Sequence, residues 1–326
     1  MKMQRKDKAG WTIEKARKIL SDAVVKTKGE AYPCHDFSLV KLIVLGQWSN
    51  VYTTIISKQK IFDSYRYVDL MAGSGTSYIR EAKCMVAGSV FVAKAFARHP
   101  YSSYVLVEKD HSRFEDLKAR SNDLNGPCQL FNEDANNVVN EIFDNQPPKT
   151  HNFVFIDNEG FNVNWNSIET ILRSKSDMLI NYPTKCFQRT TDDRTAGSLD
   201  NFFGDSSWRN ALVEGEAIDS DKALAIYEEK LRRAFWHFRG KAPYVSSIRV
   251  GMQNYFYDLI LCCKKGDYID AWEDLKTKTY WRDPNIPRNA CLLLSGKSSI
   301  LDEYIIPFEQ KKPTQPGPKY KQLSDF

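Results

Sequence analysis

Two hydrophobic patterns alternate through the middle of the chain. Short apolar runs, typical of buried strands, recur between stretches whose apolar residues have helical spacing. The predicted strands are Tyr67–Met71, Tyr104–Glu108, Cys128–Phe131, Phe153–Asp157 and Met178–Asn181, and the predicted helices between them are Ser89–Arg98, Ser112–Leu124, Ala135–Phe143 and Asn166–Arg173. Because strands that alternate with helices form parallel sheets covered on both faces, this pattern predicts a doubly wound, mostly parallel α/β fold.

The pattern changes on both sides of this region. Helices are predicted before it at Thr12–Thr27 and Phe37–Ile56, and a polar stretch with a helix over Asp221–Phe238 follows it. Two adjacent apolar runs, Tyr244–Val250 and Tyr255–Cys263, predict an antiparallel hairpin that closes the sheet. A short helix, Asp270–Lys276, comes next.

These changes divide the chain into segments. We expect an N-terminal helical segment (1–60), an α/β domain (61–275) and a C-terminal extension with a loose tail (276–326). Within the domain, residues 184–240 are predicted to be an insertion over the carboxyl edge of the sheet.

Composition narrows the function only slightly. The formal charge of +5 over 326 residues permits contact with nucleic acid without requiring it. The seven cysteines include no pair with two-residue spacing, and the five histidines are scattered, so no metal site is predicted. No apolar run approaches the ~20 residues of a membrane span, and the N-terminus lacks the apolar core of a signal peptide. A cytoplasmic protein without membrane contact is the expectation.

The chemistry concentrates where the predicted strands end. Asp69 ends the first strand and is followed by a small-residue loop, Ala72-Gly73-Ser74-Gly75. Glu108 ends the second strand, Asp134 follows the third and Asp157 ends the fourth. Ligands of open parallel sheets bind beyond these strand ends, and glycine lets a ligand approach the backbone closely.

These residues can be assigned to the parts of a nucleotide-type ligand. A carboxylate at Glu108 can accept hydrogen bonds from two ribose hydroxyls, and Asp134 can accept from an adenine amine. Each residue also has a plain structural explanation, since Asp134 in particular could cap a helix. The repetition at four consecutive strand ends favours a binding site.

S-adenosylmethionine suits this pattern better than a dinucleotide. Glu108 lies farther beyond Gly75 than the ~20 residues usual in dinucleotide sites. Thr76–Gly88 is predicted to be an inserted loop, so the glycines are not expected to lead into a helix N-terminus that would bind pyrophosphate. S-adenosylmethionine has no phosphate and is the predicted cofactor.

Over about residues 37–275, the sequence resembles the three-Cys-motif partner proteins. The matching segments are Phe37–Ser57, Val68–Gly75, Gly88-Ser89, Val107–Asp110, Phe155–Gly160 with Trp165, Asp177–Pro183, Phe202–Asp205 and Asn254–Leu259. The resemblance implies a Rossmann-like methyltransferase fold. It also implies a protein partner that resembles radical S-adenosylmethionine enzymes and carries the three cysteines.

One tetrad departs from that family. Asp157-Asn158-Glu159-Gly160 stands where the family has an Asp-Pro-aromatic-Gly pattern, which is similar to the Asp-Pro-Pro-Tyr signature of amino-methyltransferases acting on nucleic acid bases. The proline and the aromatic residue are missing, and Glu159 supplies a second carboxylate. Asp157 and Glu159 are the candidate catalytic residues, with Glu159 as a general base or a solvated loop charge.

Further candidates follow the fifth predicted strand. Asn181, Tyr182 and Arg189 are expected to face the same cleft and to bind substrate, the arginine through a phosphate or carboxylate. Trp165 and Trp208, like Tyr182, could stack on a base, although aromatic residues more often pack in a core or lid.

Two functions from different classes are therefore open. The first is an S-adenosylmethionine-dependent methyltransferase whose acceptor is nucleic acid. The second is a weakly catalytic or non-catalytic partner of a three-Cys-motif protein, in nucleic acid transactions or phage defence.

Overall fold

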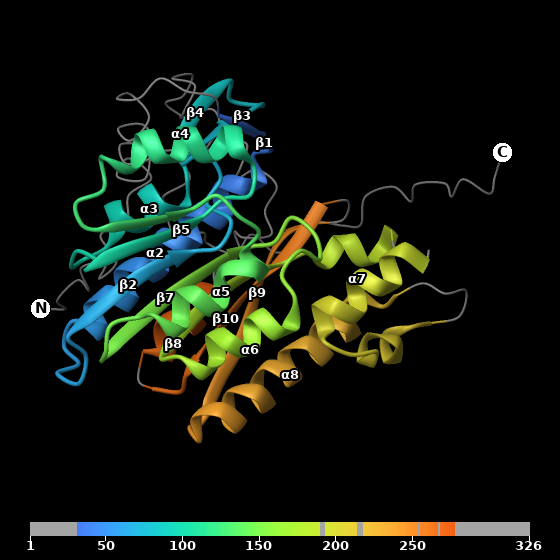
Figure 1. The fold of residues 1–326 in the computed structure, drawn as a ribbon. Coiled ribbons are helices and arrows are strands. Elements are labelled where there is room, and N and C mark those ends of the chain that lie inside the picture. Colours follow the sequence, from blue (N-terminus) through green and yellow to red (C-terminus); the bar gives the residue numbers. More distant parts are fainter. Residues whose placement is uncertain (1–30, 190–192, 214–217, 253–254, 267, 278–326) are drawn as a thin grey trace, which may run out of the picture.

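The computed structural model describes residues 31–189, 193–213, 218–252, 255–266 and 268–277. Its main sheet has seven strands in the order β6-β5-β2-β7-β8-β10-β9 (Figure 1). Their bounds are β2 (Ser64–Asp69), β5 (Ser103–Val107), β6 (Cys128–Phe131), β7 (Thr150–Asp157), β8 (Ser176–Tyr182), β9 (Pro243–Met252) and β10 (Tyr255–Lys264).

The strand pairing confirms the predicted fold class. The strands from β6 to β8 are parallel, and β10 runs antiparallel to both β8 and β9. The chain passes from β2 outward to β5 and β6, and then returns to place β7 on the other side of β2. The strand order therefore reverses between β2 and β7, which is where open α/β sheets bind ligands.

Helices cover both faces of the sheet. Apolar residues of α2 (Phe37–Ile56), α3 (Ser89–Phe96), α4 (His111–Ser121) and α9 (Ile269–Thr277) share one core with Tyr67 and Phe153. Those of α5 (Ala135–Asp144), α6 (Trp165–Arg173), α7 (Asp193–Phe203) and α8 (Ser220–Arg239) share the other core with Val68 and Val154. Strands buried on both faces are continuously apolar, which explains their clear sequence signal.

The segment Thr76–Gly88 is not the predicted loop. It forms a hairpin of β3 (Thr76–Ile79) and β4 (Cys84–Ala87), and β1 (Tyr32–Cys34) pairs in parallel with β3 to complete a second, three-stranded sheet. None of these strands was predicted. They are short, and the partner of β3 lies far away in the sequence, so no local pattern reveals the pairing.

The segment 184–240 also differs from the prediction. Its first part contains the 3-10 helices η1 (Thr184–Arg189) and η2 (Ser207–Ala211) around α7. Its helix α8 does not lie over the carboxyl edge: it packs along the sheet face beside α6 and β9, burying Leu224, Tyr227, Leu231 and Phe235. Thus α8 is the crossover helix between β8 and β9, and ends at Gly240 in the left-handed conformation.

The two ends of the chain add little to the tested predictions. The helix predicted at Thr12–Thr27 and nearly all of the extension 276–326 lie outside the described residues, and the division into segments stays a prediction. Contrary to the expectation from apolar runs, α2 is long and apolar enough to cross a membrane, but 61% of its most apolar window is buried inside the protein. A core helix covered by protein has the same composition.

Candidate functional site

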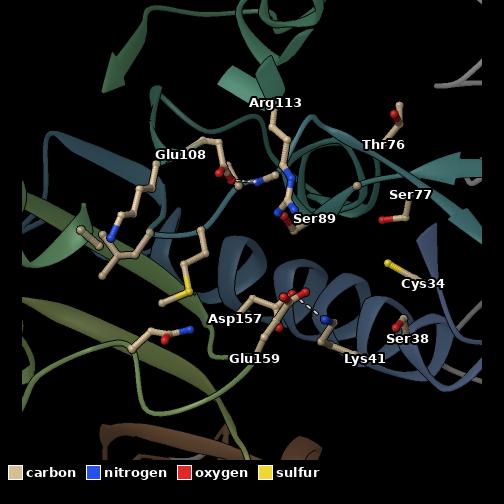
Figure 2. Close-up of a pocket in the computed structure, with 18 of the residues that line it drawn as sticks. Cys34, Ser38, Lys41, Thr76, Ser77, Ser89, Glu108, Arg113, Asp157 and Glu159 are labelled. Atoms are coloured by element: carbon tan, nitrogen blue, oxygen red, sulfur yellow. Dashed lines mark hydrogen bonds and ion pairs between the residues drawn. The ribbon is translucent and has the colours of Figure 1, made fainter. Parts of the chain in front are cut away.

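A cavity of about 340 Å³ opens at the carboxyl ends of the strands around the point where their order reverses (Figure 2). Its lining includes Ala72 and Gly73 after β2, Glu108 after β5, Asp134 after β6 and Asp157 at the end of β7. The structure thus brings together the four strand ends that the sequence singled out.

The loop after β2 is shaped by its glycines. Gly73 and Gly75 have φ values of 60° and 80°, in the left-handed region that favours glycine. The Gly73 amide donates to Glu108 Oε2 at 2.9 Å, which fixes the loop against the end of β5. Ser74 and Gly75 do not line the cavity: Ser74 Oγ donates to the Thr76 carbonyl at 3.1 Å within the loop. Only Ala72 and Gly73 of the predicted loop contact the site.

The N-terminus of α3, which comes 14 residues after Gly75 in the sequence, lies at the site. The Gly88 amide donates to the Gly75 carbonyl at 2.8 Å, so the residues before and after the hairpin β3–β4 lie next to each other. Helix α3 begins at Ser89, which lines the cavity. As predicted, the glycines do not lead directly into a helix, because the hairpin β3–β4 follows them and α3 begins only at Ser89. The prediction did not foresee that the start of α3 nevertheless lies at the site. The pairing of Gly75 with Gly88 continues the β3–β4 ladder beyond Thr76 and Ala87, and it was missed because this hairpin was not predicted.

Asp69 was predicted to bind cofactor, but its carboxylate lies beneath the site. It is fully buried, does not line the cavity, and accepts from Tyr67 Oη at 2.9 Å, Ser89 Oγ at 2.5 Å and the Met71 amide at 3.3 Å. Burial raises the pKa of Asp69 to about 6, although the bonds from Ser89 and Tyr67 oppose the rise. Asp69 therefore ties the start of α3 to β2.

Glu108 lines the cavity directly after the end of β5. It is 7% exposed, and its Oε1 accepts from the Asp110 amide at 2.8 Å while Oε2 accepts from Gly73. These two amides hold both carboxylate oxygens in one orientation at the cavity wall.

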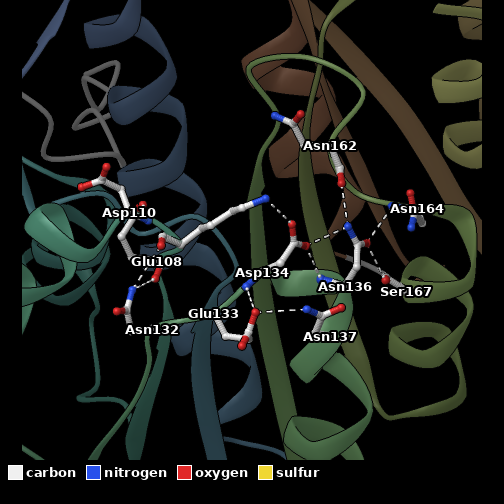
Figure 3. A network of polar contacts seen from close by, with 11 residues as sticks. Glu108, Asp110, Asn132, Glu133, Asp134, Asn136, Asn137, Asn162, Asn164 and Ser167 are labelled. Carbon is white, nitrogen blue, oxygen red and sulfur yellow. Dashed lines mark hydrogen bonds and ion pairs between the residues drawn. The ribbon is translucent and has the colours of Figure 1, made fainter. Parts of the chain in front are cut away.

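Asp134 has both of the roles that the sequence left open. It caps α5 by accepting from the Asn136 amide at 3.0 Å, and it lines the cavity (Figure 3). Burial by itself would raise the pKa of Asp134, but the ammonium of Lys109, 2.9 Å away, and the Asn136 amide hold that pKa below its ordinary value.

Asp157 is held by two residues from different elements. Lys41 Nζ, from α2, lies 2.5 Å from its Oδ2, and Asn181 Nδ2, from β8, donates to its Oδ1 at 2.8 Å. The side chains of Lys41 and Asp157 are 13% and 18% exposed. Lys41 was not predicted from the sequence. A single charged residue within the apolar helix α2 was the feature that could have indicated it.

Glu159 faces the cavity from the loop after β7, close to Asp157 and Arg113 (Figure 2). Within the described ranges, its carboxylate has no hydrogen bond or ion pair. Burial and the neighbouring Asp157 charge raise the pKa of Glu159, against the opposing charges of Lys41 and Arg113.

Two of the three predicted substrate residues, Asn181 and Tyr182, do not line the cavity. Tyr182 is fully buried in an aromatic cluster, with its ring stacked 5.3 Å from that of Phe187. Its position in β8 directs the side chain into the core that the sheet shares with α5, α6, α7 and α8. Asn181 lies beneath Asp157 and does not line the cavity. Arg189 ends η1, but its side chain lies outside the described part of the chain.

The two tryptophans singled out in the sequence are packing residues. Trp165 packs edge-on against Tyr227, and Trp208 donates from Nε1 to Asp200 at 2.7 Å. Both are 6% exposed, and neither lines the cavity.

The far end of the cavity is built by elements that the sequence did not assign to a site. Cys34 of β1, Ser38 and Lys41 of α2 and Ser77 of β3 line it (Figure 2). The N-terminal helix and the small sheet therefore belong to the site.

The lining is acidic overall. Five carboxylates (Glu108, Glu133, Asp134, Asp157, Glu159) face three cations (Lys41, Lys109, Arg113), a difference of two negative charges. Such a lining favours a cationic ligand over a polyphosphate. In the part of the chain that is described, no group of three His, Cys, Asp or Glu residues could hold a metal ion.

This arrangement defines a class: a Rossmann-like, doubly wound α/β fold, with a parallel sheet closed by an antiparallel hairpin and a cavity at its topological switch point. No family model matches the sequence, and no curated protein matches it.

Among solved structures, the following similarities were found. Protein LPL1258 from Legionella pneumophila is 11% identical, with a TM-score of 0.45 over 74% of this chain and 93% of its own. The O-methyltransferase TomG from Streptomyces achromogenes, solved with S-adenosylmethionine, is 12% identical, with a TM-score of 0.39 over 81% and 92%. Trm1 from Pyrococcus horikoshii, also solved with S-adenosylmethionine, is 12% identical, with a TM-score of 0.38 over 68% and 56%.

Proposed function

We propose that this protein binds S-adenosylmethionine and transfers its methyl group. The observation that carries the proposal is Glu108, whose carboxylate is fixed by the Gly73 and Asp110 amides in a net acidic cavity at the switch point of the sheet. A carboxylate so oriented can accept from ribose hydroxyls, and the acidic lining favours a ligand that carries a sulfonium.

The residues present fit the parts of this cofactor. Glu108 would hold the ribose, Asp134 an adenine amine, and the Gly73 loop with the start of α3 the amino acid part. When bound, the cofactor supplies an electrophilic methyl group, and the protein supplies its position. The adenosine would lie toward β5 and β6 and the methyl group toward β7, because Glu108 and Asp157 flank the Gly73 loop on opposite sides.

Asp157 and Glu159 would act on the acceptor. Asp157 orients neighbouring groups and Glu159 accepts a proton in this proposal. No aromatic side chain is among the described residues that line the cavity, so a flipped-out base would find no ring to stack on. A nucleic acid acceptor therefore stays in the proposal, but without a base held by aromatic stacking in the cavity.

Calorimetric titration tests the cofactor assignment. The purified protein is titrated with S-adenosylmethionine, S-adenosylhomocysteine and NAD⁺ under one set of conditions. We expect binding of the first two and none of NAD⁺, whose pyrophosphate meets the acidic lining. Absence of S-adenosylmethionine binding, or preference for NAD⁺, would show that the proposal is wrong.

A second candidate function rests on Asp157. Both of its oxygens are taken by Lys41 and Asn181, and the proline and aromatic of the related tetrad are missing. We propose as the alternative that the protein keeps the fold as a partner of a radical-enzyme-like three-Cys-motif protein, in nucleic acid transactions or phage defence. Membership of the three-Cys-motif partner family and a cytoplasmic location belong to this proposal.

Co-expression tests the partner function. A neighbouring three-Cys protein, produced together with this chain, should copurify as a stable complex. If Asp157→Ala and Glu159→Ala abolish a cellular phenotype while the complex stays intact, a purely structural role is excluded.

A further inference from the structure

The end of the cavity nearest β7 contains two carboxylates in different surroundings. Asp157 is bonded to Lys41 Nζ at 2.5 Å and to Asn181 Nδ2 at 2.8 Å, so each oxygen has a partner from a neighbouring element. Glu159 lines the same end of the cavity, and its carboxylate has neither a hydrogen bond nor an ion pair within the described ranges. The sequence offered both acids as catalytic candidates, and the tertiary structure gives them different partners.

Lys41 is the cause of that separation. It comes from α2, outside the alternating strands and helices, and is the one charged residue of that apolar helix. Burial by itself would lower the pKa of Lys41, but the Asp157 carboxylate outweighs it and raises that pKa, so the ammonium stays charged. A charged lysine in an apolar helix is costly unless it is paired, which indicates that the pair with Asp157 is fixed.

We propose that Lys41 is a positioning residue that commits Asp157 to a fixed ion pair and leaves Glu159 as the carboxylate that accepts the proton of the methyl acceptor. The inference rests on the proposed function. The O–H or N–H bond of the acceptor breaks, and its proton joins a Glu159 oxygen. The acceptor atom keeps the electron pair and forms the bond to the methyl carbon, while the pair of the broken carbon–sulfur bond remains on sulfur.

The charges around Glu159 come from four elements. Asp157 of β7 and Glu108 after β5 disfavour the ionised form of Glu159, while Lys41 of α2 and Arg113 of α4 favour it. The Cys34 thiol of β1 lies in the same group, and burial raises its pKa. Removing Lys41 leaves two carboxylates side by side, and such pairs hold a shared proton to higher pH.

Carbon NMR of protein labelled at the glutamate carboxyl carbons measures this directly. The Glu159 signal is assigned by its loss in Glu159→Gln and followed through a pH titration. Lys41→Met should raise the pKa of Glu159 by about 1–3 units, the usual effect of one close charge. Lys41→Arg should restore the wild-type titration, because the guanidinium can still pair with Asp157.

Two further variants keep the test sharp. Asp157→Asn should lower the pKa of Glu159, because Lys41 then faces Glu159 alone; this opposite sign decides the matter if Lys41→Met does not fold. Lys109→Met is the matched control. It removes the same charge from the same cavity lining, where Lys109 pairs with Asp134, and should leave the Glu159 titration unchanged.

The outcomes separate this inference from the proposed function. If Lys41→Met and Asp157→Asn both fold and leave the Glu159 titration unchanged, the role of Lys41 is wrong even where S-adenosylmethionine binds. If the titration responds as expected but S-adenosylmethionine does not bind, the ion pair is confirmed and the methyltransferase role of Lys41 is overturned.

Discussion

Gly88 lies directly against the backbone of Gly75. Its amide donates to the Gly75 carbonyl at 2.8 Å, and a Cβ atom on Gly88 would come within 2.6 Å of the Gly75 carbonyl carbon. Because of this contact, the hairpin β3–β4 extends from the site without separating the glycine loop from the helix that follows it.

Gly88→Ala should therefore destabilise the protein and disturb the site. Gly88 has φ −76°, which alanine adopts freely, so the effect is steric alone. We expect the free energy of unfolding to fall by about 1–3 kcal/mol, the usual cost of overpacking, with weaker cofactor binding. Denaturant unfolding and calorimetry measure the two effects.

Gly197→Ala is the matched control for this change. Gly197 lies in α7, and a Cβ atom there meets nothing within 4 Å. Alanine in a helix is more favourable than glycine by about 0.5–1 kcal/mol, so this variant should be slightly more stable. Equal effects of the two substitutions would contradict the steric explanation.

Glu108→Ala should weaken S-adenosylmethionine binding by about 10- to 100-fold, the range for hydrogen bonds to a charged group. The variant loses the ribose contact and releases the Gly73 and Asp110 amides. Glu115→Ala, on the exposed surface of α4, is the control and should bind as the wild type does. An unchanged affinity in Glu108→Ala, measured by calorimetry, would remove the basis of the cofactor assignment.

Tyr182→Phe should leave the stability unchanged or raise it by up to about 1 kcal/mol. The Tyr182 hydroxyl is buried, and no group in the described part of the chain bonds to it, so its removal relieves a desolvation penalty. Tyr67→Phe is the contrasting variant: it loses the bond to Asp69 and should be destabilised by about 1 kcal/mol. Thermal unfolding of both proteins checks the order; a large loss of stability in Tyr182→Phe would show a missing partner.

The pH dependence of stability should report on Asp69. Its pKa is raised to about 6 in the folded protein from 3.8, so the folded state holds a proton that the unfolded chain releases. The free energy of unfolding attributable to Asp69 therefore falls as the pH rises from about 4 to about 6, by about 3 kcal/mol for a shift of two units.

The free energy of unfolding of Asp69→Asn should fall less than that of the wild type between about pH 4 and about pH 6, because the asparagine binds no proton. Asp177, whose pKa burial raises to about 7, and His151, whose pKa burial lowers to about 3, act in both proteins and cancel in the difference. Urea unfolding at several pH values gives the comparison. Parallel curves for the variant and the wild type would mean that Asp69 does not carry this proton.

The sequence by itself determined the order of the alternating strands and helices of the main sheet and most of their strand ends, but not β1, β3 and β4 of the small sheet. The strands are buried on both faces, so their apolar runs are continuous. Asp69 and Asp157 end β2 and β7, and Glu108 and Asp134 follow β5 and β6. Parallel strands bring such ends to one edge, which is why four acids far apart in the sequence could be placed near one cavity.

Only the tertiary structure decided how each of those residues is used. Asp69 and Tyr182 are buried because side-chain direction at a strand end depends on register and on what covers each face. Lys41 was not recognised because its partner, Asp157, comes from a distant element, and contacts between distant segments leave no periodic trace in the sequence. The contact of Gly88 with Gly75 was missed because the β3–β4 hairpin between them was not predicted. The sequence thus located the loop Ala72–Gly75. Packing decided that the start of α3 adjoins this loop, that the Glu108 carboxylate is fixed against it and that Lys41 pairs with Asp157.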